Sequence, residues 1–325
     1  MAVMNMVDAL NSALDNELER DPRVVVLGED VGRDGGVFRV TQSLLKKYGE
    51  LRVVDTPLAE SAIVGASLGM SLNGLKPVAE VQFDGFTYAT FDQLFSHVAR
   101  MRTRTRGRFT APLVVRFPYG GLVRALEHHS ESPEAFFCHF PGLKVVAPSS
   151  PYEAKGLLIA AIRDPDPVIF MEPKRLYRAI KEDVPETPYI IPLGEARVVQ
   201  EGSDVTIVSY GSMLQSCLEA VKLVAGAASC EVIDLRTLTP WDERTVIDSV
   251  GKTGRLVIVH EAPRNCGLGG EIAATIQQKC FYKLSAPIAR VTSWDIITPL
   301  PKMETRHFPS VSRIAKAIIE TATLQ

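Results

Sequence analysis

Short apolar runs of strand length alternate with helix-length segments along almost all of this chain. In the first half the runs are "RVVVLG" (23–28), "RVVD" (52–55), "PVAEVQF" (77–83), "LVVRF" (113–117), "LKVVAP" (143–148) and "PVIFME" (167–172). Apolar residues at helical spacing predict helices near 6–18, 41–48, 58–72, 87–104 and 150–164. Strands that alternate with helices in this way pair in parallel, so we expect a parallel sheet with helices on both faces.

The alternation stops once and then resumes. Residues 173–203, which include "EDVPETPYIIPLG", are rich in Pro and Glu and have no sustained period. Beyond them, strands are predicted at 205–211, 230–235, 255–261 and 288–292, and helices at 213–226, 241–250, 270–282 and 311–322. A chain of 325 residues favours two domains over one. We therefore predict α/β domains at 1–175 and 204–325, joined by a connector at 176–203.

Composition and charge exclude several classes of protein. The net charge is −2 and the pI is near 6.3, so no global basic field invites nucleic acid. The basic run at 100–108 is typical of a solvated helix end or a subunit contact. Five dispersed cysteines without a Cys-x-x-Cys pair indicate a reducing compartment. No signal pattern and no run of membrane-spanning length are found, so a cytoplasmic protein without a membrane partner is expected.

Glu60 stands between an Asp-Thr-Pro turn and the small, apolar run "SAIVGASLGMSL". One interpretation is a helix-end charge, with Thr56 as the cap and Glu60 stabilised by the helix dipole. The other is a binding site. Gly65 and Gly69 recur on one helical face and permit close packing, so we expect this helix to be buried at an interface. A buried carboxylate needs a partner, and a ligand's ring nitrogen would supply one.

Nine stretches spread along the chain resemble one family of proteins. They are "GEDV" (28–31), "GGVFRVT" (35–41), "DTPLAESAIVG" (55–65), "EVQFDGFTYATFDQ" (80–93), "HSESPEAFF" (129–137), "KVVAPSSPYEAKGLL" (144–158), "EPKRLYR" (172–178), "DLRTLTPWD" (234–242) and "KTGRLVIVHEAPR" (252–264). Together they resemble the β subunit of the thiamine-diphosphate-dependent decarboxylase of 2-oxo acid dehydrogenase complexes. The resemblance implies a transketolase-like fold, with a pyrimidine-binding domain followed by a transketolase C-terminal-like domain.

The resemblance also implies roles for residues of the first domain. Glu60 matches the family's cofactor-activating glutamate, whose hydrogen bond to the aminopyrimidine promotes the imino tautomer that deprotonates the thiazolium carbon. Gln82 matches a position beside the cofactor, and Leu58 matches a residue that lines the same pocket. Phe86 stands where some members have a stacking Tyr, so the ring is kept and the hydroxyl is lost. Core packing is the alternative interpretation for Leu58 and Phe86.

Two adjacent histidines occur in "EHHSES" (127–132). Neighbouring residues point in different directions, and no further Cys or His lies at ligand spacing, so a metal site is disfavoured. A histidine in a capped loop is the plain alternative. By resemblance, His129 matches the family's active-site histidine, which would act in reductive acylation of a lipoyl group. His128 has no such match.

Glycine-rich stretches suggest no complete phosphate site. "GRDGG" (32–36) and "GLGGE" (267–271) fit neither a Walker pattern nor a dinucleotide fingerprint and are interpreted as turns. The chain also has no Gly-Asp-Gly, the motif with which thiamine-diphosphate enzymes hold magnesium and diphosphate. The resemblance therefore implies an α subunit that supplies this half, in a heterotetramer of two α and two β chains. It further implies a structural potassium ion on backbone carbonyls at Ala111, Leu113, Val114, Ala161, Asp164 and Asp166.

The resemblance predicts a lipoyl-acylating 2-oxo acid dehydrogenase that works beside a dihydrolipoyl acyltransferase. "DGFTYATFDQ" and "HSESPEAFF" look closer to branched-chain members, so branched-chain 2-oxo acids are the expected substrates. Pyruvate or acetoin is the alternative. A non-catalytic scaffold subunit is a rival of another class, and the retention of Glu60 and His129 disfavours it. A nucleotide-binding oxidoreductase is disfavoured because no strand is followed by Gly-x-Gly-x-x-Gly.

Overall fold

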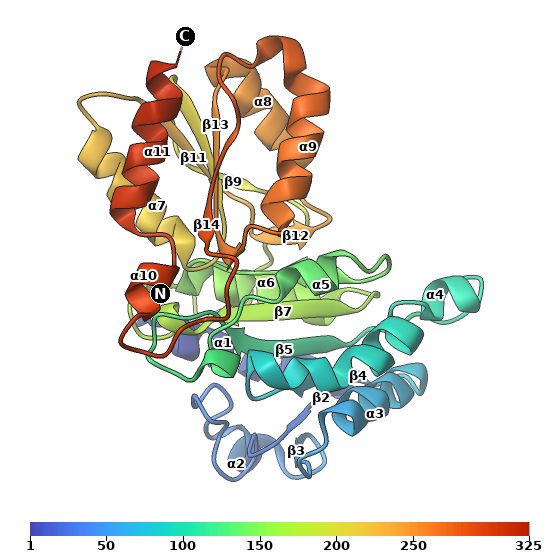
Figure 1. Cartoon of the computed structure of the whole chain (residues 1–325). Coiled ribbons are helices and arrows are strands. Elements are labelled where there is room, and N and C mark those ends of the chain that lie inside the picture. The colour runs from blue at the N-terminus through green and yellow to red at the C-terminus, as the bar shows by residue number, and fades with distance from the viewer. Residues whose placement is uncertain (325) are drawn as a thin grey trace. The chain divides into compact units, whose positions relative to one another are not determined.

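The computed structural model describes residues 1–324 and divides into two compact units (Figure 1). The first unit comprises Met1–Tyr119 and Phe136–Leu193, and the second comprises Gly120–Ala135 and the chain from Gly194 onward. The sequence analysis had placed 120–135 in the first domain and 176–193 in a connector. In the structure, 120–135 packs with the second unit and 176–193 with the first. Residues 194–203, also placed in the connector, lie in the second unit.

The first unit is built on a parallel sheet, as predicted, with neighbouring strands in the order β6-β7-β5-β4-β2-β3. The strands are β2 (Val24–Gly28), β3 (Val53–Asp55), β4 (Lys76–Glu80), β5 (Val114–Tyr119), β6 (Lys144–Val146) and β7 (Val168–Pro173). The helices are α1 (Met6–Arg20), α2 (Leu44–Tyr48), α3 (Glu60–Leu72), α4 (Met101–Arg104) and α6 (Pro151–Arg163). Short helical turns are η1 (Asp84–Thr90), η2 (Asp92–Val98) and η4 (Lys174–Leu176), and α5 (Glu134–Cys138) spans the boundary of the units.

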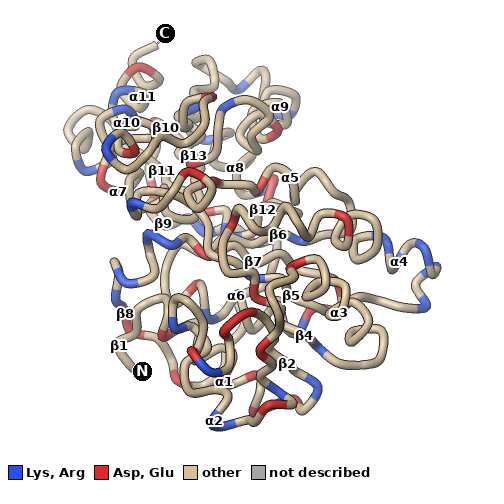
Figure 2. The backbone as a smooth tube through the Cα atoms, turned by 60° about the horizontal axis from the view of Figure 1, so that its bottom comes forward, with Lys and Arg blue, Asp and Glu red and all other residues tan. Residues whose placement is uncertain are grey.

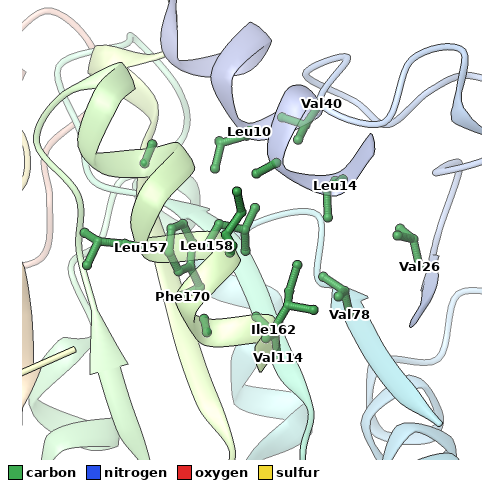
Figure 3. Close-up of a cluster of buried hydrophobic side chains, with 14 of the residues drawn as sticks. Leu10, Leu14, Val26, Val40, Val78, Val114, Leu157, Leu158, Ile162 and Phe170 are labelled. Atoms are coloured by element: carbon green, nitrogen blue, oxygen red, sulfur yellow. The ribbon is translucent and has the colours of Figure 1, made fainter. Parts of the chain in front are cut away.

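Helices α1 and α6 pack together on one face of this sheet and form its main core (Figure 3). Leu10 and Leu14 of α1 meet Leu157 and Leu158 of α6, and all four side chains are fully buried. Each helix begins at a side-chain cap: Asn5 and Asp8 form a capping box before α1, and the Ser150 hydroxyl accepts from the Glu153 N–H before α6. Local capping and apolar spacing therefore agree, which explains why both helices were predictable.

The prediction of one long helix at 87–104 is wrong, because the segment is helical but is not a single regular α-helix. The structure has the 3₁₀ turn η1, the π-helix η2 and the short helix α4 instead. Within η1, the Thr87 hydroxyl donates to the Asp84 carbonyl at 2.6 Å and the Thr90 hydroxyl to the Thr87 carbonyl at 2.6 Å. Hydroxyl bonds to carbonyls three residues back compete with the α-helical ladder. The basic run predicted from the sequence surrounds α4, where Figure 2 shows Lys and Arg along the tube.

The Pro-rich segment around 182–186, for which the sequence predicted no helix or strand, is bound to the first unit. Strand β8 (Glu182–Val184) pairs in antiparallel register with β1 (Ala2–Met4). The Lys155 ammonium, buried on α6, donates to the Pro185 carbonyl at 2.7 Å and the Glu186 carbonyl at 2.9 Å. These bonds give the buried ammonium two backbone acceptors and fix the segment, which has no apolar pattern of its own.

The second unit is a smaller α/β domain, whose sheet has the strand order β14-β13-β10-β11-β9. Its strands are β9 (Arg197–Gln200), β10 (Val205–Ser209), β11 (Cys230–Asp234), β13 (Leu256–Pro263) and β14 (Ala289–Ser293), with the short strand β12 at Thr237–Thr239. Its helices are α7 (Met213–Val224), α8 (Glu243–Thr253), α9 (Leu268–Cys280), α10 (Glu304–His307) and α11 (Val311–Thr323), with turns η3 (Glu127–His129) and η5 (Phe281–Lys283). Helices α7 and α11 cover one face and α8 and α9 the other (Figure 1).

The predicted parallel pairing holds for β10, β11, β13 and β14, and the added edge strand β9 runs antiparallel to β11. Across residues 1–324, no helix combines the length and apolar character needed to cross a membrane.

Candidate active site

The carboxyl ends of three neighbouring strands meet in one row in the first unit. Gly28 at the end of β2 is in register with Asp55 at the end of β3 and with Glu80 at the end of β4. Glu29 and Gln82 follow this row directly, and Glu60 follows it after a short turn. Parallel α/β sheets bind ligands at the carboxyl ends of their strands, so this edge is the expected location of a site.

The loop after β2 is held rigidly against this edge. The Asp55 carboxylate accepts from the Gly32 N–H and, at 3.0 Å, from the Arg33 N–H. Gly35 has a φ of +73°, and a Cβ there would lie 2.7 Å from the Gln42 Cα. The "GRDGG" glycines are therefore turn glycines, as the sequence analysis interpreted them.

Glu60 is the first residue of α3, and its side chain is half-buried. The predicted cap is wrong: Ala59 occupies the N-cap position without a side-chain bond, and the Thr56 hydroxyl is buried with no hydrogen-bond partner in residues 1–324. The Glu60 carboxylate, within the same residues, accepts no hydrogen bond and forms no ion pair. Burial, together with the charges of Glu60 and Asp30, raises the pKa of Glu29. The carboxyl groups of Glu29 and Glu60 thus lie close enough for their charges to interact at the start of α3.

The other residues predicted around the cofactor lie on the same edge. The Gln82 amide donates to Asp30 Oδ2 at 3.0 Å. Phe86, in η1, contacts the Phe83 ring edge-on at a centroid distance of 6.0 Å. Leu58 is 77% exposed, so it is not a core residue of this unit and stands open to a ligand or another chain.

The face of α3 that was predicted to lie at an interface is only partly covered by this chain. Gly65 faces the Gln93 side chain, to which an added Cβ would approach within 3.2 Å. Gly69 is exposed and has nothing within 4 Å of such an atom. Close packing on the Gly69 side stays a prediction for a second chain.

A buried ionic network that the sequence analysis missed lies beneath the row of strand ends. Arg116 of β5 forms an ion pair with Glu80 of β4 and donates to Glu172 of β7 at 2.6 and 2.8 Å. The Tyr177 hydroxyl donates to Glu172 at 2.6 Å. Burial raises the pKa of Glu80, although the Arg116 charge opposes that rise. The sequence did contain a signal for this network: each of three neighbouring apolar strands has a charged residue near its end.

His129 lies in the second unit, in the loop Gly120–Ala135. Its ring is half-buried in η3 and lies 4.9 Å, between centroids, from the exposed ring of His128. Among residues 1–324, no group of three or more His, Cys, Asp or Glu side chains is arranged to hold a metal ion. The loop closes on itself because the Gly120 N–H donates to the Glu131 carbonyl at 2.8 Å.

Glu134 ends this loop as a fully buried carboxyl group. It accepts from the Tyr210 hydroxyl at 2.6 Å. Burial raises the pKa of Glu134 to about 7, against the hydrogen bond from Tyr210. The group is therefore protonated in the folded chain at pH values where it is ionised in the unfolded chain.

Glu134→Gln should remove a pH dependence of stability. A raised carboxyl pKa contributes stability that is present below pH 4.5 and is lost as the pH rises to about 7. The parent should thus lose about 1.4 kcal/mol per pH unit relative to the variant between pH 5 and 7. Urea unfolding of both proteins at pH 5, 6 and 7 measures this, and a difference that is constant with pH would contradict it.

The residues implied in potassium binding occupy two adjoining segments of the first unit. The Val168 N–H donates to the Leu113 carbonyl at 3.0 Å, which brings the start of β5 beside the segment that follows α6. The side chains of Asp164 and Asp166 are already paired, with Lys144 at 2.6 Å and Arg102 at 2.7 Å. A potassium ion there would bind carbonyl oxygens, and it stays a prediction.

Comparison with known proteins identifies the class to which both units belong. The families described as "Transketolase, pyrimidine binding domain" and "Transketolase, C-terminal domain" match residues 2–180 and 194–314. A solved structure, "Split gene transketolase, inactive beta4 tetramer", has a TM-score of 0.82 and 21% identity over 99% of both chains. The fold is thus transketolase-like, as predicted.

Proteins related in sequence identify the family more narrowly than the fold does. The chain is 53% identical, over 99% of each chain, to "Pyruvate dehydrogenase E1 component subunit beta" of Acholeplasma laidlawii. It is 50% identical, over 98% of this chain and 89% of the relative, to "2-oxoisovalerate dehydrogenase subunit beta 2, mitochondrial" of Arabidopsis thaliana. The Bacillus subtilis "Pyruvate dehydrogenase E1 component subunit beta" is 47% identical over 99% of this chain and 98% of its own length. This chain belongs to the family of β subunits of the E1 component of 2-oxo acid dehydrogenases.

Proposed function

We propose that this chain supplies the pyrimidine-binding half of a thiamine diphosphate site and thereby activates the cofactor of a 2-oxo acid dehydrogenase. The observation that carries the proposal is the half-buried Glu60 carboxylate, which has no partner in residues 1–324 and lies at the strand edge with Gln82 and Phe86. A carboxyl group, an amide and an aromatic face are the groups that an aminopyrimidine ring requires. The residues present therefore fit this cofactor.

Each residue has a defined task toward the ring. When bound, the cofactor supplies the carbanion-stabilising chemistry of decarboxylation. Glu60 holds and moves a proton at a pyrimidine nitrogen, as a general acid–base positioned by the start of α3. Phe86 would pack against the ring, and the exposed Leu58 side chain would add an apolar contact to it. Gln82 orients the ring by hydrogen bonding while Asp30 fixes the Gln82 amide.

The diphosphate half of the site belongs to an α subunit. This chain has no Gly-Asp-Gly with which to hold magnesium and diphosphate. The exposed small residues of α3 and the exposed Leu58 side chain suit a close contact with another chain. We infer a heterotetramer of two α and two β subunits that delivers acyl groups to the lipoyl domain of a dihydrolipoyl acyltransferase.

The substrate is a short 2-oxo acid. The stretches "DGFTYATFDQ" and "HSESPEAFF" favour a branched-chain 2-oxo acid. Pyruvate is as well supported, because a relative named for pyruvate is 53% identical to this chain and one named for 2-oxoisovalerate is 50% identical. Acetoin, the remaining alternative, has no support from these names.

Coexpression with the α subunit tests this function. The assembled enzyme should decarboxylate a 2-oxo acid in the presence of thiamine diphosphate and magnesium, and the chain alone should not. The ratio of kcat/KM for 3-methyl-2-oxobutanoate and pyruvate decides the substrate. Magnesium-dependent turnover by the chain alone would contradict the two-chain site, and an assembled enzyme that is inactive on every 2-oxo acid would favour a scaffold subunit.

His129→Ala should impair lipoyl acylation more than cofactor binding. His129 matches the family's active-site histidine, and its imidazole can transfer protons at neutral pH. We expect a loss of acylation of about a hundredfold or more with an unchanged Kd for thiamine diphosphate. His128→Ala is the matched control, since that ring is exposed and has no assigned role. Acylation by His129→Ala at the parental rate would remove His129 from the mechanism.

A further inference from the structure

Two buried carboxylates of the second unit hold the start of the loop that carries His129. Glu304, at the start of α10, is 2% exposed, and it accepts from the backbone N–H groups of Leu122 and, at 3.1 Å, of Arg124. Glu261 of β13 accepts from the Gly121 N–H and, at 2.6 Å, from the Ser212 hydroxyl. Within residues 1–324, Glu304 forms no ion pair, so its hydrogen-bond partners are these N–H groups of the loop.

The two residues that donate to Glu304 have an unfavourable backbone conformation. Leu122 and Arg124 have φ values of +63° and +60°, in the left-handed region that non-glycine residues avoid. Successive N–H groups in such a backbone converge on an anion and form a nest. Each oxygen of Glu304 takes one of the two bonds, so a carboxylate is required and an amide cannot replace it.

The same loop carries His129 between two fixed ends. Just before the nest, the Gly120 N–H donates to the Glu131 carbonyl at 2.8 Å and closes the loop. The His129 N–H donates to the Leu126 carbonyl at 2.9 Å, and the Ser130 hydroxyl donates to the same carbonyl at 3.0 Å. A change at the Glu304 nest therefore displaces a short closed loop, in which His129 lies two residues before the closing residue Glu131.

We propose that Glu304 is a positioning residue for His129, holding the loop Gly120–Ala135 in the conformation that presents the imidazole for acyl transfer to lipoyl groups. This inference rests on the role proposed above for His129. Glu304 acts through backbone N–H groups and touches no reacting atom. Its loss is therefore specific to the step that uses His129 and leaves the chemistry at Glu60 intact.

The test compares two partial reactions of the assembled α/β enzyme. Glu304→Gln keeps the side-chain volume but presents an amide N–H to one loop N–H. Lipoyl acylation should fall by about ten- to a hundredfold, because a misplacement of about 1 Å has an effect of that size. Decarboxylation measured with an artificial electron acceptor should stay within about twofold of the parent, since it does not use the loop. Glu320→Gln, at an exposed glutamate of α11 that pairs with Lys316 at 3.6 Å, is the matched control.

A second pair of variants keeps the proposal testable if Glu304→Gln does not fold. Arg124 is exposed, so substitutions there spare the core. Arg124→Pro removes the N–H that Glu304 binds and forbids a positive φ, and it should lose acylation selectively. Arg124→Gly keeps the N–H and favours the observed φ, and it should acylate like the parent.

A double-mutant cycle separates positioning from general stabilisation. If Glu304 acts through His129, Glu304→Gln should cause no further loss of acylation in the His129→Ala background. Parental acylation by Glu304→Gln, or losses that multiply in the double variant, would overturn the inference and leave the role of His129 standing. Parental acylation by His129→Ala itself would overturn that role and this inference together.

Discussion

Glu60→Gln should assemble with the α subunit and bind thiamine diphosphate, yet lose most of its activity. The amide keeps the shape of the side chain at the start of α3 and removes only its ability to hold and release a proton. General acid–base groups accelerate reactions by about a hundred- to ten-thousandfold, which is roughly 3 to 5 kcal/mol of activation free energy. A helix-end charge at a surface site contributes at most about 1 kcal/mol to stability, so the two interpretations of Glu60 differ clearly in size.

The control for this substitution is an exposed glutamate of the same unit. Glu19 lies on α1 with a 69% exposed side chain, and Glu19→Gln should leave kcat unchanged. Cofactor affinity and α-subunit assembly are measured beside kcat. A Glu60→Gln enzyme with parental kcat would return Glu60 to the role of a helix-end charge.

Arg116→Met should destabilise the chain by about 3–5 kcal/mol. Arg116 is 1% exposed and lies between Glu80 and Glu172, which are themselves buried. Removal of one partner of a buried ion pair leaves an uncompensated charge, and here it leaves two carboxylates facing each other. Burial already raises the pKa of Glu80, and loss of the opposing Arg116 charge would raise it further, so the loss of stability should be largest above pH 7 and smaller near pH 5, where a proton neutralises this group.

An exposed arginine ion pair provides the matched comparison. Arg102 pairs with Asp166 at 2.7 Å but is 48% exposed, so Arg102→Met should lose no more than about 1 kcal/mol. Urea unfolding of the three proteins, followed by circular dichroism, measures both effects. Equal losses for the two variants would show that the network beneath the strand ends does not depend on burial.

Much of the fold was predictable because local and global signals agree. The runs predicted as strands at 23–28, 52–55 and 77–83 match strands that end at Gly28, Asp55 and Glu80, and α1 and α6 carry their own caps. The position of Glu60 near a helix start also followed from the sequence, since the turn and the apolar run around it are local features.

Interactions between distant residues were not predictable. Arg116 lay hidden in an apolar strand, and its partners Glu80 and Glu172 are 36 and 56 residues away. The loop of His129 was placed in the first domain because it follows β5 in sequence. Its anchors Glu261 and Glu304 are 140 and 182 residues from the N–H groups that they bind. Hydrogen bonds to backbone N–H groups leave no side-chain pattern in the loop that a single sequence could reveal.

The central claim is that the Glu60 carboxylate activates thiamine diphosphate bound between this chain and an α subunit. The most direct test is the rate of hydrogen–deuterium exchange at the thiazolium carbon of the cofactor, measured by quenched-flow NMR in the assembled parent and in Glu60→Gln. We expect exchange in the variant to be slower by about a hundredfold or more, because the proton relay at the pyrimidine is lost. Exchange at the parental rate in a variant that binds the cofactor fully would contradict the account.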